Sequence, residues 1–214
     1  MPTLRDGRIL VISIDSLLVN PRRAHMRQLL DGVPFEFVDG VVVSDVNADL
    51  NEWCKSRGLR VPSPSTFFQP KPGDLGVLLA FMQTWEYMVR ERVSSAWILE
   101  DDVVANPALT NVFEYNVPIP AGTDVAFVHP YGGFGMYCTY VTLAGAEKLV
   151  SARDRLIALD KPVDLALWHG DLPEIQIMSF QNTSHWLFVQ ASPLNDSKHS
   201  QRVAFNDKLV GMRV

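Results

Sequence analysis

Hydrophobic positions along the chain occur in short continuous runs and in helically spaced stripes, and the two kinds alternate. Residues 9–14 are an almost unbroken apolar run, as expected of a strand that is buried on both faces. Residues 22–30 follow with apolar side chains at helical spacing, and residues 35–38 read as a second short strand. A strand, a helix and a strand within about thirty residues predict an α/β fold.

Elements of both kinds continue to residue 190. The predicted helices span 47–58, 74–92, 144–153 and 160–170, and another short helical stretch is expected to begin at Asn106. The predicted strands span 96–99, 124–128, 136–142, 175–180 and 186–190. Residues 59–73 hold four prolines and are expected to form a loop. We expect one domain over residues 1–214, with a mostly parallel central sheet flanked by helices.

Three consecutive carboxylates, Glu100, Asp101 and Asp102, follow directly on the predicted strand 96–99. If the chain stays extended, Glu100 and Asp102 share one face and Asp101 takes the other. Two carboxylates about 4 Å apart repel by roughly 4 kcal/mol at an effective dielectric of 20, so they favour water or a cation between them. The cluster therefore has two interpretations: a metal–diphosphate site at the carboxyl end of a strand, or a solvated acidic turn.

Basic and glycine-containing segments elsewhere leave similar alternatives open. Arg22 and Arg23, early in the first predicted helix after Asn20-Pro21, are either a solvated face or a contact for phosphate. Residues 129–135 contain three glycines and form either a close approach to a ligand or a plain turn.

The predicted helix 160–170 carries a carboxylate in an unusual setting. Asp160 is a suitable N-cap and Gly170 a suitable stop. Asp164 is spaced to lie on the same side as Leu167 and Trp168. A carboxylate on an apolar face needs a partner, so Asp164 is either a functional group or a structural one bonded to a neighbouring loop.

Composition narrows the function classes. The chain has 214 residues with a formal net charge of −5, so no overall positive field attracts nucleic acid or anionic lipid. Its two cysteines, Cys54 and Cys138, do not form a C-x-x-C pair, which makes a disulfide scaffold or zinc knuckle unexpected. Residues 1–8 lack a signal-peptide pattern, and no apolar run approaches the length of a membrane span. We expect a cytoplasmic, soluble protein.

Several short motifs occur in a fixed order along most of the chain. They are Ile12-Ser13-Ile14 followed by Arg22, FEFVDGV at 35–41, GDLG at 73–76 with Trp85, ILEDD at 98–102, TYVT at 139–142, PVD at 162–164, and Val189-Gln190 followed by Ser197. In this order they resemble glycosyltransferase family 25, which includes lipooligosaccharide and collagen galactosyltransferases. Val77, Ala80 and Phe81 depart from the family pattern, which has Cys, Ser and His at these positions.

The resemblance implies a GT-A type fold, a nucleotide-diphosphate sugar donor such as a UDP-sugar, bound Mn²⁺ or Mg²⁺, and an inverting mechanism. It implies Asp102 as the principal metal ligand, with Glu100 beside the metal or the ribose. Asp101 is either part of the donor site or a support of the loop by hydrogen bonds, and His199 is either a further metal ligand or an exposed residue of the polar tail. Asp164 would be the catalytic base, with Asp171 and then Glu174 in reserve. The donor site implied by the matching motifs comprises Ser13, Arg22, Asp39, Gly76, Glu100 and Asp101.

The acceptor is not specified by the sequence. The resemblance favours a cell-surface glycan, as in lipopolysaccharide biosynthesis. A hydroxyl on a protein or on a modified nucleic-acid base stays open, and the acidic balance disfavours the nucleic acid. Two other functions compete: a nucleotide-sugar-binding module without turnover, which the Ala80-Phe81 departure motivates, and a metal-dependent phosphoesterase that uses the same carboxylates.

Overall fold

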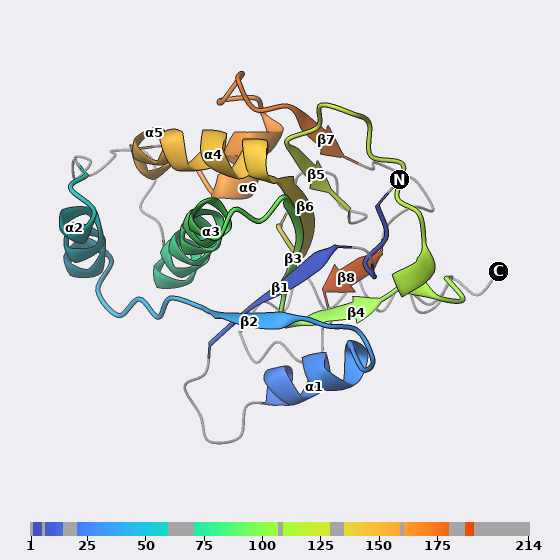
Figure 1. Ribbon diagram of the computed structural model, residues 1–214. Coiled ribbons are helices and arrows are strands. Elements are labelled where there is room, and N and C mark those ends of the chain that lie inside the picture. Colours follow the sequence, from blue (N-terminus) through green and yellow to red (C-terminus); the bar gives the residue numbers. More distant parts are fainter. Residues whose placement is uncertain are drawn as a thin grey trace.

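The computed structural model describes residues 2–5, 7–14, 21–59, 71–106, 109–128, 135–158, 161–179 and 187–190 (Figure 1). Within these residues one six-stranded sheet has the order β2-β1-β3-β6-β5-β7. Its strands are β1 (Arg8–Ser13), β2 (Glu36–Asp39), β3 (Ser95–Glu100), β5 (Val125–Phe127), β6 (Cys138–Thr142) and β7 (Ile177–Ser179). A second sheet pairs β4 (Val103–Ala105) with β8 (Phe188–Gln190) in antiparallel fashion.

The direction of the strands confirms the predicted architecture. β1 pairs in parallel with both β2 and β3, and β5 pairs in parallel with β7. β6 runs antiparallel to its two neighbours, β3 and β5. Five strands of this sheet therefore point one way, as predicted for a mostly parallel α/β sheet, and their carboxyl ends meet at one edge.

Helices cover both faces of the sheet, and α3 to α6 gather on the face opposite α1 (Figure 1). The helices are α1 (Pro21–Leu29), α2 (Val46–Ser56), α3 (Pro72–Arg90), α4 (Leu143–Ser151), α5 (Arg153–Ala158) and α6 (Val163–Trp168), with a 3-10 helix at Val112–Glu114. Side chains along each strand point alternately to the two faces of the sheet, so the hydrophobic core consists of one cluster on each face. Leu10 and Ile98 pack under the α3 side, whereas Val11 and Leu99 pack on the α1 side.

The longest helix, α3, packs on the sheet through the apolar stripe that the sequence predicts. Leu75, Leu79, Met82 and Trp85 of α3 are at most 2% exposed. Their spacing of three and four residues puts them on one face, which packs against α4 and the sheet. Burying side chains of this size stabilises the fold by about 1.5–3 kcal/mol each, so α3 is fixed firmly beneath the first strands.

Two sequence predictions need correction. The chain does not stay extended after β3, because Asp101 and Asp102 form a turn before β4. The helix predicted over 160–170 is described only from Val163, where Pro162 is the N-cap without a side-chain hydrogen bond; Asp160 lies outside the described residues.

The helical stretch expected at Asn106 falls partly outside the described residues, and residues 109–111 are not helical. There the amide of Leu109 donates to the carbonyl of Asn106 at 3.1 Å, while residues 107–108 lie outside the described part of the chain. Regular helical structure follows only at Val112.

Candidate active site

The site is built at the carboxyl ends of β1, β2 and β3. In the sheet register Ser13 lies opposite Asp39, and Ile12 lies opposite Glu100. The chain leaves β1 towards β2 on one side and later adds β3 on the other, so the strand order reverses at β1. In open α/β sheets such a reversal leaves a crevice outside the carboxyl ends, where ligands bind.

Asp101 is held by the first strand and the first helix. The hydroxyl of Ser13 donates to its Oδ2 at 2.6 Å, and Nη1 of Arg22 donates to its Oδ1 at 3.0 Å. The side chain of Asp101 is only 9% exposed, whereas that of Arg22 is 32% exposed. The buried bond from Ser13 to this charged group stabilises by about 1.5–3 kcal/mol, and the partly exposed Arg22 adds at most about 1 kcal/mol. The acidic turn at Asp101 and Asp102 is thereby fixed to β1 and α1.

Asp102 faces the same guanidinium as Asp101. Its Oδ2 lies 3.9 Å from Nη2 of Arg22, and its side chain is 5% exposed. The expectation that Asp101 and Asp102 point to opposite faces is therefore wrong, because the turn replaces the alternation of an extended strand. Glu100, which ends β3, is partly buried, and its amide donates to the carbonyl of Tyr137 at 3.1 Å.

Arg23, for which the sequence left a solvated face or a phosphate contact open, is a structural arginine of the site. It is 9% exposed and donates from Nε to the Ser13 hydroxyl at 3.3 Å and from Nη2 to Asp39 Oδ1 at 2.7 Å. Its guanidinium also lies 4.7 Å from the ring centroid of Phe37. The solvated-face interpretation is wrong for this residue. Its spacing of three residues before the buried Met26 was the signal, since that spacing places both on one helix face.

Asp164 is brought to the same edge of the sheet by a backbone contact. Its Oδ2 accepts a hydrogen bond from the amide of Gly135 at 2.5 Å. Leu99 pairs with Cys138 in antiparallel register, so Gly135 lies beyond β6 towards the carboxyl end of β3. The carboxylate at the start of α6 therefore lies on the side of the sheet that carries Glu100. The partner that an apolar setting demands for Asp164 is the Gly135 amide.

Gly135 could not be replaced by a larger residue without strain. Its φ is +84°, and a Cβ atom there would meet the ring of Tyr137 at 2.3 Å. Both constraints require glycine. Of the segment 129–135, only Gly135 belongs to the described residues.

The reserve candidates for the base have other partners. Asp171 forms an ion pair with Lys161 at 2.7 Å, and Glu174 forms one with Arg155. Asp171 lies beyond Trp168, where α6 ends, and its amide donates to the carbonyl of Ala166 at 3.1 Å. Asp171 and Glu174 lead into the amino end of β7, so both lie away from the edge that carries Asp164.

Glycines let the rim of the site pack closely. A Cβ at Gly76 would lie 2.6 Å from the carbonyl oxygen of Val41, so this glycine lets the first turn of α3 approach the end of β2. Three apolar side chains are exposed after β1, after β2 and near the start of α3: Ile14 at 42%, Val42 at 65% and Val77 at 42%. An apolar rim thus adjoins the charged residues of the site.

A metal ion would find oxygen donors at the acidic turn. Among the described residues no three Asp, Glu, His or Cys side chains gather closely enough to hold a metal by themselves. The carboxylates of Asp101 and Asp102 nevertheless face one cationic group, Arg22, and hard divalent ions prefer such oxygens. These residues fit a divalent cation that also has ligands from a bound diphosphate. His199 lies outside the described residues.

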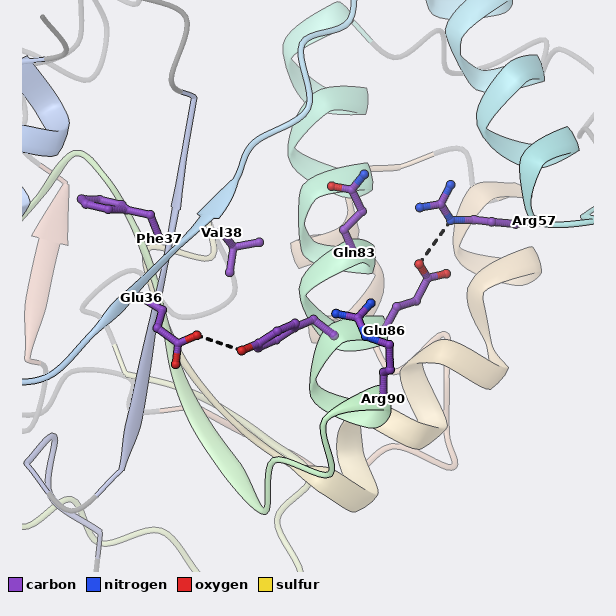
Figure 2. A pocket seen from close by; sticks show the side chains of 8 residues that line it. Glu36, Phe37, Val38, Arg57, Gln83, Glu86 and Arg90 are labelled. Atoms are coloured by element: carbon purple, nitrogen blue, oxygen red, sulfur yellow. Dashed lines mark hydrogen bonds and ion pairs between the residues drawn. The ribbon is translucent and has the colours of Figure 1, made fainter.

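A pocket of about 350 Å³ lies away from this site, between the edge strand β2 and helices α2 and α3 (Figure 2). It is lined by Glu36, Phe37, Val38, Arg57, Gln83, Glu86, Tyr87 and Arg90. Its charges are paired within the chain: Arg57 with Glu86 at 3.2 Å, and Glu36 with Arg8 at 2.6 Å. Tyr87 donates to Glu36 at 2.8 Å, a bond that raises the pKa of the phenol.

Comparison with known proteins identifies the family. The family model described as "Glycosyltransferase family 25 (LPS biosynthesis protein)" matches residues 7–120, more than half of the chain, including β1 to β3 and the acidic turn. The chain belongs to glycosyltransferase family 25. It is therefore a glycosyltransferase, and the resemblance inferred from the ordered motifs is confirmed. No curated protein matches the sequence significantly.

Solved glycosyltransferase structures resemble this member of family 25 only distantly. One is a glycosyltransferase involved in glycosylation of the major capsid of PBCV-1, with 14% identity, a TM-score of 0.46 and coverage of 96% of this chain and 98% of the other. Another is a mutant Drosophila β-1,4-galactosyltransferase 7 with manganese, UDP-Gal and xylobiose, with 9% identity, a TM-score of 0.43 and coverage of 92% and 78%. At these TM-scores the family assignment rests on the sequence match.

The residues that depart from the family pattern lie in different surroundings in this glycosyltransferase. Ala80 and Phe81 of α3 are 2% and 1% exposed and belong to the core. Val77 is instead on the rim. Among the described residues no helix is long and apolar enough to cross a membrane.

Proposed function

We propose that the protein transfers a sugar from a UDP-sugar donor to a glycan hydroxyl, with Mn²⁺ or Mg²⁺ and with inversion at the anomeric carbon. The observation that carries this proposal is the gathering of Ser13, Arg22, Asp101 and Asp102 at the carboxyl ends of β1 and β3. Oxygen donors for a cation and a guanidinium for phosphate lie together there, as the transfer of a diphosphate-linked sugar requires.

The residues of the site have distinct roles in this proposal. Asp102 and Glu100 hold the cation and the adjacent ribose, and Asp101 holds the turn through Ser13. When bound, the metal offsets the negative charge that develops on the leaving diphosphate. Asp39 is 86% exposed beyond Arg23 and is available to a donor hydroxyl. The apolar rim at Ile14, Val42 and Val77 offers contact to the flat base of the nucleotide.

Asp164 accepts the acceptor's proton in this proposal. Inversion needs one base on the side opposite the leaving group, and Asp164 lies at the correct edge of the sheet. The Gly135 amide binds its Oδ2, which orients the carboxylate and leaves Oδ1 to approach a hydroxyl. Asp171 stays the reserve candidate, although its ion pair with Lys161 and its place beyond α6 make it the weaker one.

The experiment measures donor binding and turnover separately. UDP-sugars are incubated with the protein, Mn²⁺ and a panel of glycans, peptides and hydroxylated DNA, and release of UDP is followed. Asp164→Asn should retain UDP affinity and lose roughly 10²–10⁴-fold in turnover, the usual contribution of a general base. Turnover within a few-fold of wild type would remove Asp164 from the role. Binding without release in the wild type would identify a nucleotide-sugar-binding module instead.

A further inference from the structure

The positively charged guanidinium of Arg22 lies beside both carboxylates of the acidic turn. Its two terminal nitrogens reach different carboxylates, Nη1 to Asp101 Oδ1 at 3.0 Å and Nη2 to Asp102 Oδ2 at 3.9 Å. One guanidinium therefore serves two acidic side chains that are 9% and 5% exposed. Buried carboxylates need such a counter-ion, because burial disfavours an unpaired charge.

A movement of the Arg22 side chain would leave the start of α1 held by Arg23. Its side chain is 32% exposed, and it is the second residue of the helix. The neighbouring Arg23 is buried and bound to Ser13 and Asp39, so it fixes the start of α1 independently. Rotation about the side-chain bonds of Arg22 is therefore sufficient to move its charge by several Å while the helix stays in place.

A divalent cation at Asp102 would compete with the guanidinium of Arg22 for the Asp102 carboxylate, and the two positive charges would repel each other. A diphosphate changes this balance, because an arginine binds phosphate oxygens in a bidentate manner. Diphosphate binding draws the Arg22 guanidinium away from the metal site, and metal binding releases the guanidinium for the diphosphate. Each ligand therefore raises the affinity for the other, which is a thermodynamic coupling between two ligands.

We propose that Arg22 is a switching counter-ion. In the ligand-free enzyme it neutralises Asp101 and Asp102, and on donor binding it yields this place to the metal and turns to the donor diphosphate. The proposal rests on the metal-dependent function proposed above and adds a regulation of the same site: metal alone binds weakly, and metal with diphosphate binds tightly.

The test compares Arg22→Gln with Arg27→Gln, which removes the same charge from an exposed position on the same helix. Binding of Mn²⁺ alone is measured from the electron paramagnetic resonance signal of the free ion, and UDP binding is measured by calorimetry at saturating Mn²⁺. Arg22→Gln should bind Mn²⁺ alone about tenfold more tightly and UDP about tenfold more weakly, within the usual range of coupling factors. Arg27→Gln should match the wild type in both.

The opposite signs separate a switch from a structural role. If Arg22→Gln weakens both Mn²⁺ and UDP binding, Arg22 merely maintains the turn and the proposal is overturned. Unchanged affinity for Mn²⁺ alone in Arg22→Gln also overturns it, while the proposed function stands. If the wild type binds no Mn²⁺ even with UDP, the metal-dependent function itself fails, which is evident before any variant is compared. Thermal unfolding shows that each variant is folded.

Discussion

The hydrogen bond between Ser13 and Asp101 is the contact on which the architecture of the acidic turn depends most. We consider Ser13→Ala, Asp101→Ala and the double variant. The bond joins β1 to the turn at 2.6 Å, and both residues are less than a tenth exposed, at 2% and 7%. A buried bond to a charged acceptor contributes about 1.5–3 kcal/mol. Because solvent screens the partly exposed Arg22, its ion pair with Asp101 adds at most about 1 kcal/mol.

These values predict a loss of about 2 kcal/mol for Ser13→Ala and about 3 kcal/mol for Asp101→Ala. The double variant should lose less free energy of unfolding than the two single variants together. The difference should be about 1.5 kcal/mol or more, because either single change already removes the same bond. Urea unfolding followed by tryptophan fluorescence measures the stability of all three variants, with Trp97, which is buried in β3, as a reporter.

Ser151→Ala is the control for this cycle. Ser151 is exposed and donates only to the carbonyl of Glu147 in its own helix, so its replacement should change stability by no more than about 0.5 kcal/mol. A coupling energy below about 0.5 kcal/mol between Ser13 and Asp101 would refute the reasoning, since it would mean that the turn does not depend on this bond.

Two other predictions concern stability. Gly135→Ala should cost about 1–3 kcal/mol more than Gly122→Ala in thermal unfolding, because both glycines have φ near +85° but only the former has a neighbour, the Tyr137 ring, within 4 Å; equal costs would contradict the predicted clash. The pKa of Tyr87 is raised, first by its hydrogen bond to Glu36 and then by burial, so its contribution to stability is complete below about pH 10 and is lost as pH rises through the folded-state pKa. The stability difference between wild type and Tyr87→Phe in urea should therefore shrink above pH 10, and a difference that stays constant there would count against the bond.

The parts of the fold that local periodicity determines were predictable. The apolar run that forms β1 and the stripe of α3 are each encoded in neighbouring residues, and both elements form close to the predicted places. β4 was missed because a three-residue strand carries little local signal, and its pairing partner at Phe188–Gln190 is far along the chain. The short helix α5 was missed as well, whereas the predicted helix 144–153 ends within two residues of the end of α4 at Ser151.

The candidate site was predictable in its residue types but not in its geometry. The sequence indicates acidic residues at the end of β3, but the turn at Asp101 depends on Ser13 and Arg22, which are about eighty residues earlier in the chain. The burial of Arg23 was not predicted because an arginine is usually exposed, whereas here Asp39 and Ser13 compensate its burial. The partner of Asp164 is a backbone amide, which no pattern of side chains reveals.

The most direct test of the central claim is the dependence of UDP affinity on Mn²⁺ in Asp102→Ala. UDP is titrated by calorimetry into wild type, Asp102→Ala and the exposed control Asp31→Ala, each with and without Mn²⁺. The wild type and Asp31→Ala should bind UDP at least about tenfold more tightly with Mn²⁺, and Asp102→Ala should lose this increase while it stays folded. An undiminished Mn²⁺-dependent increase in Asp102→Ala would contradict the assignment of the acidic turn as the metal–diphosphate site.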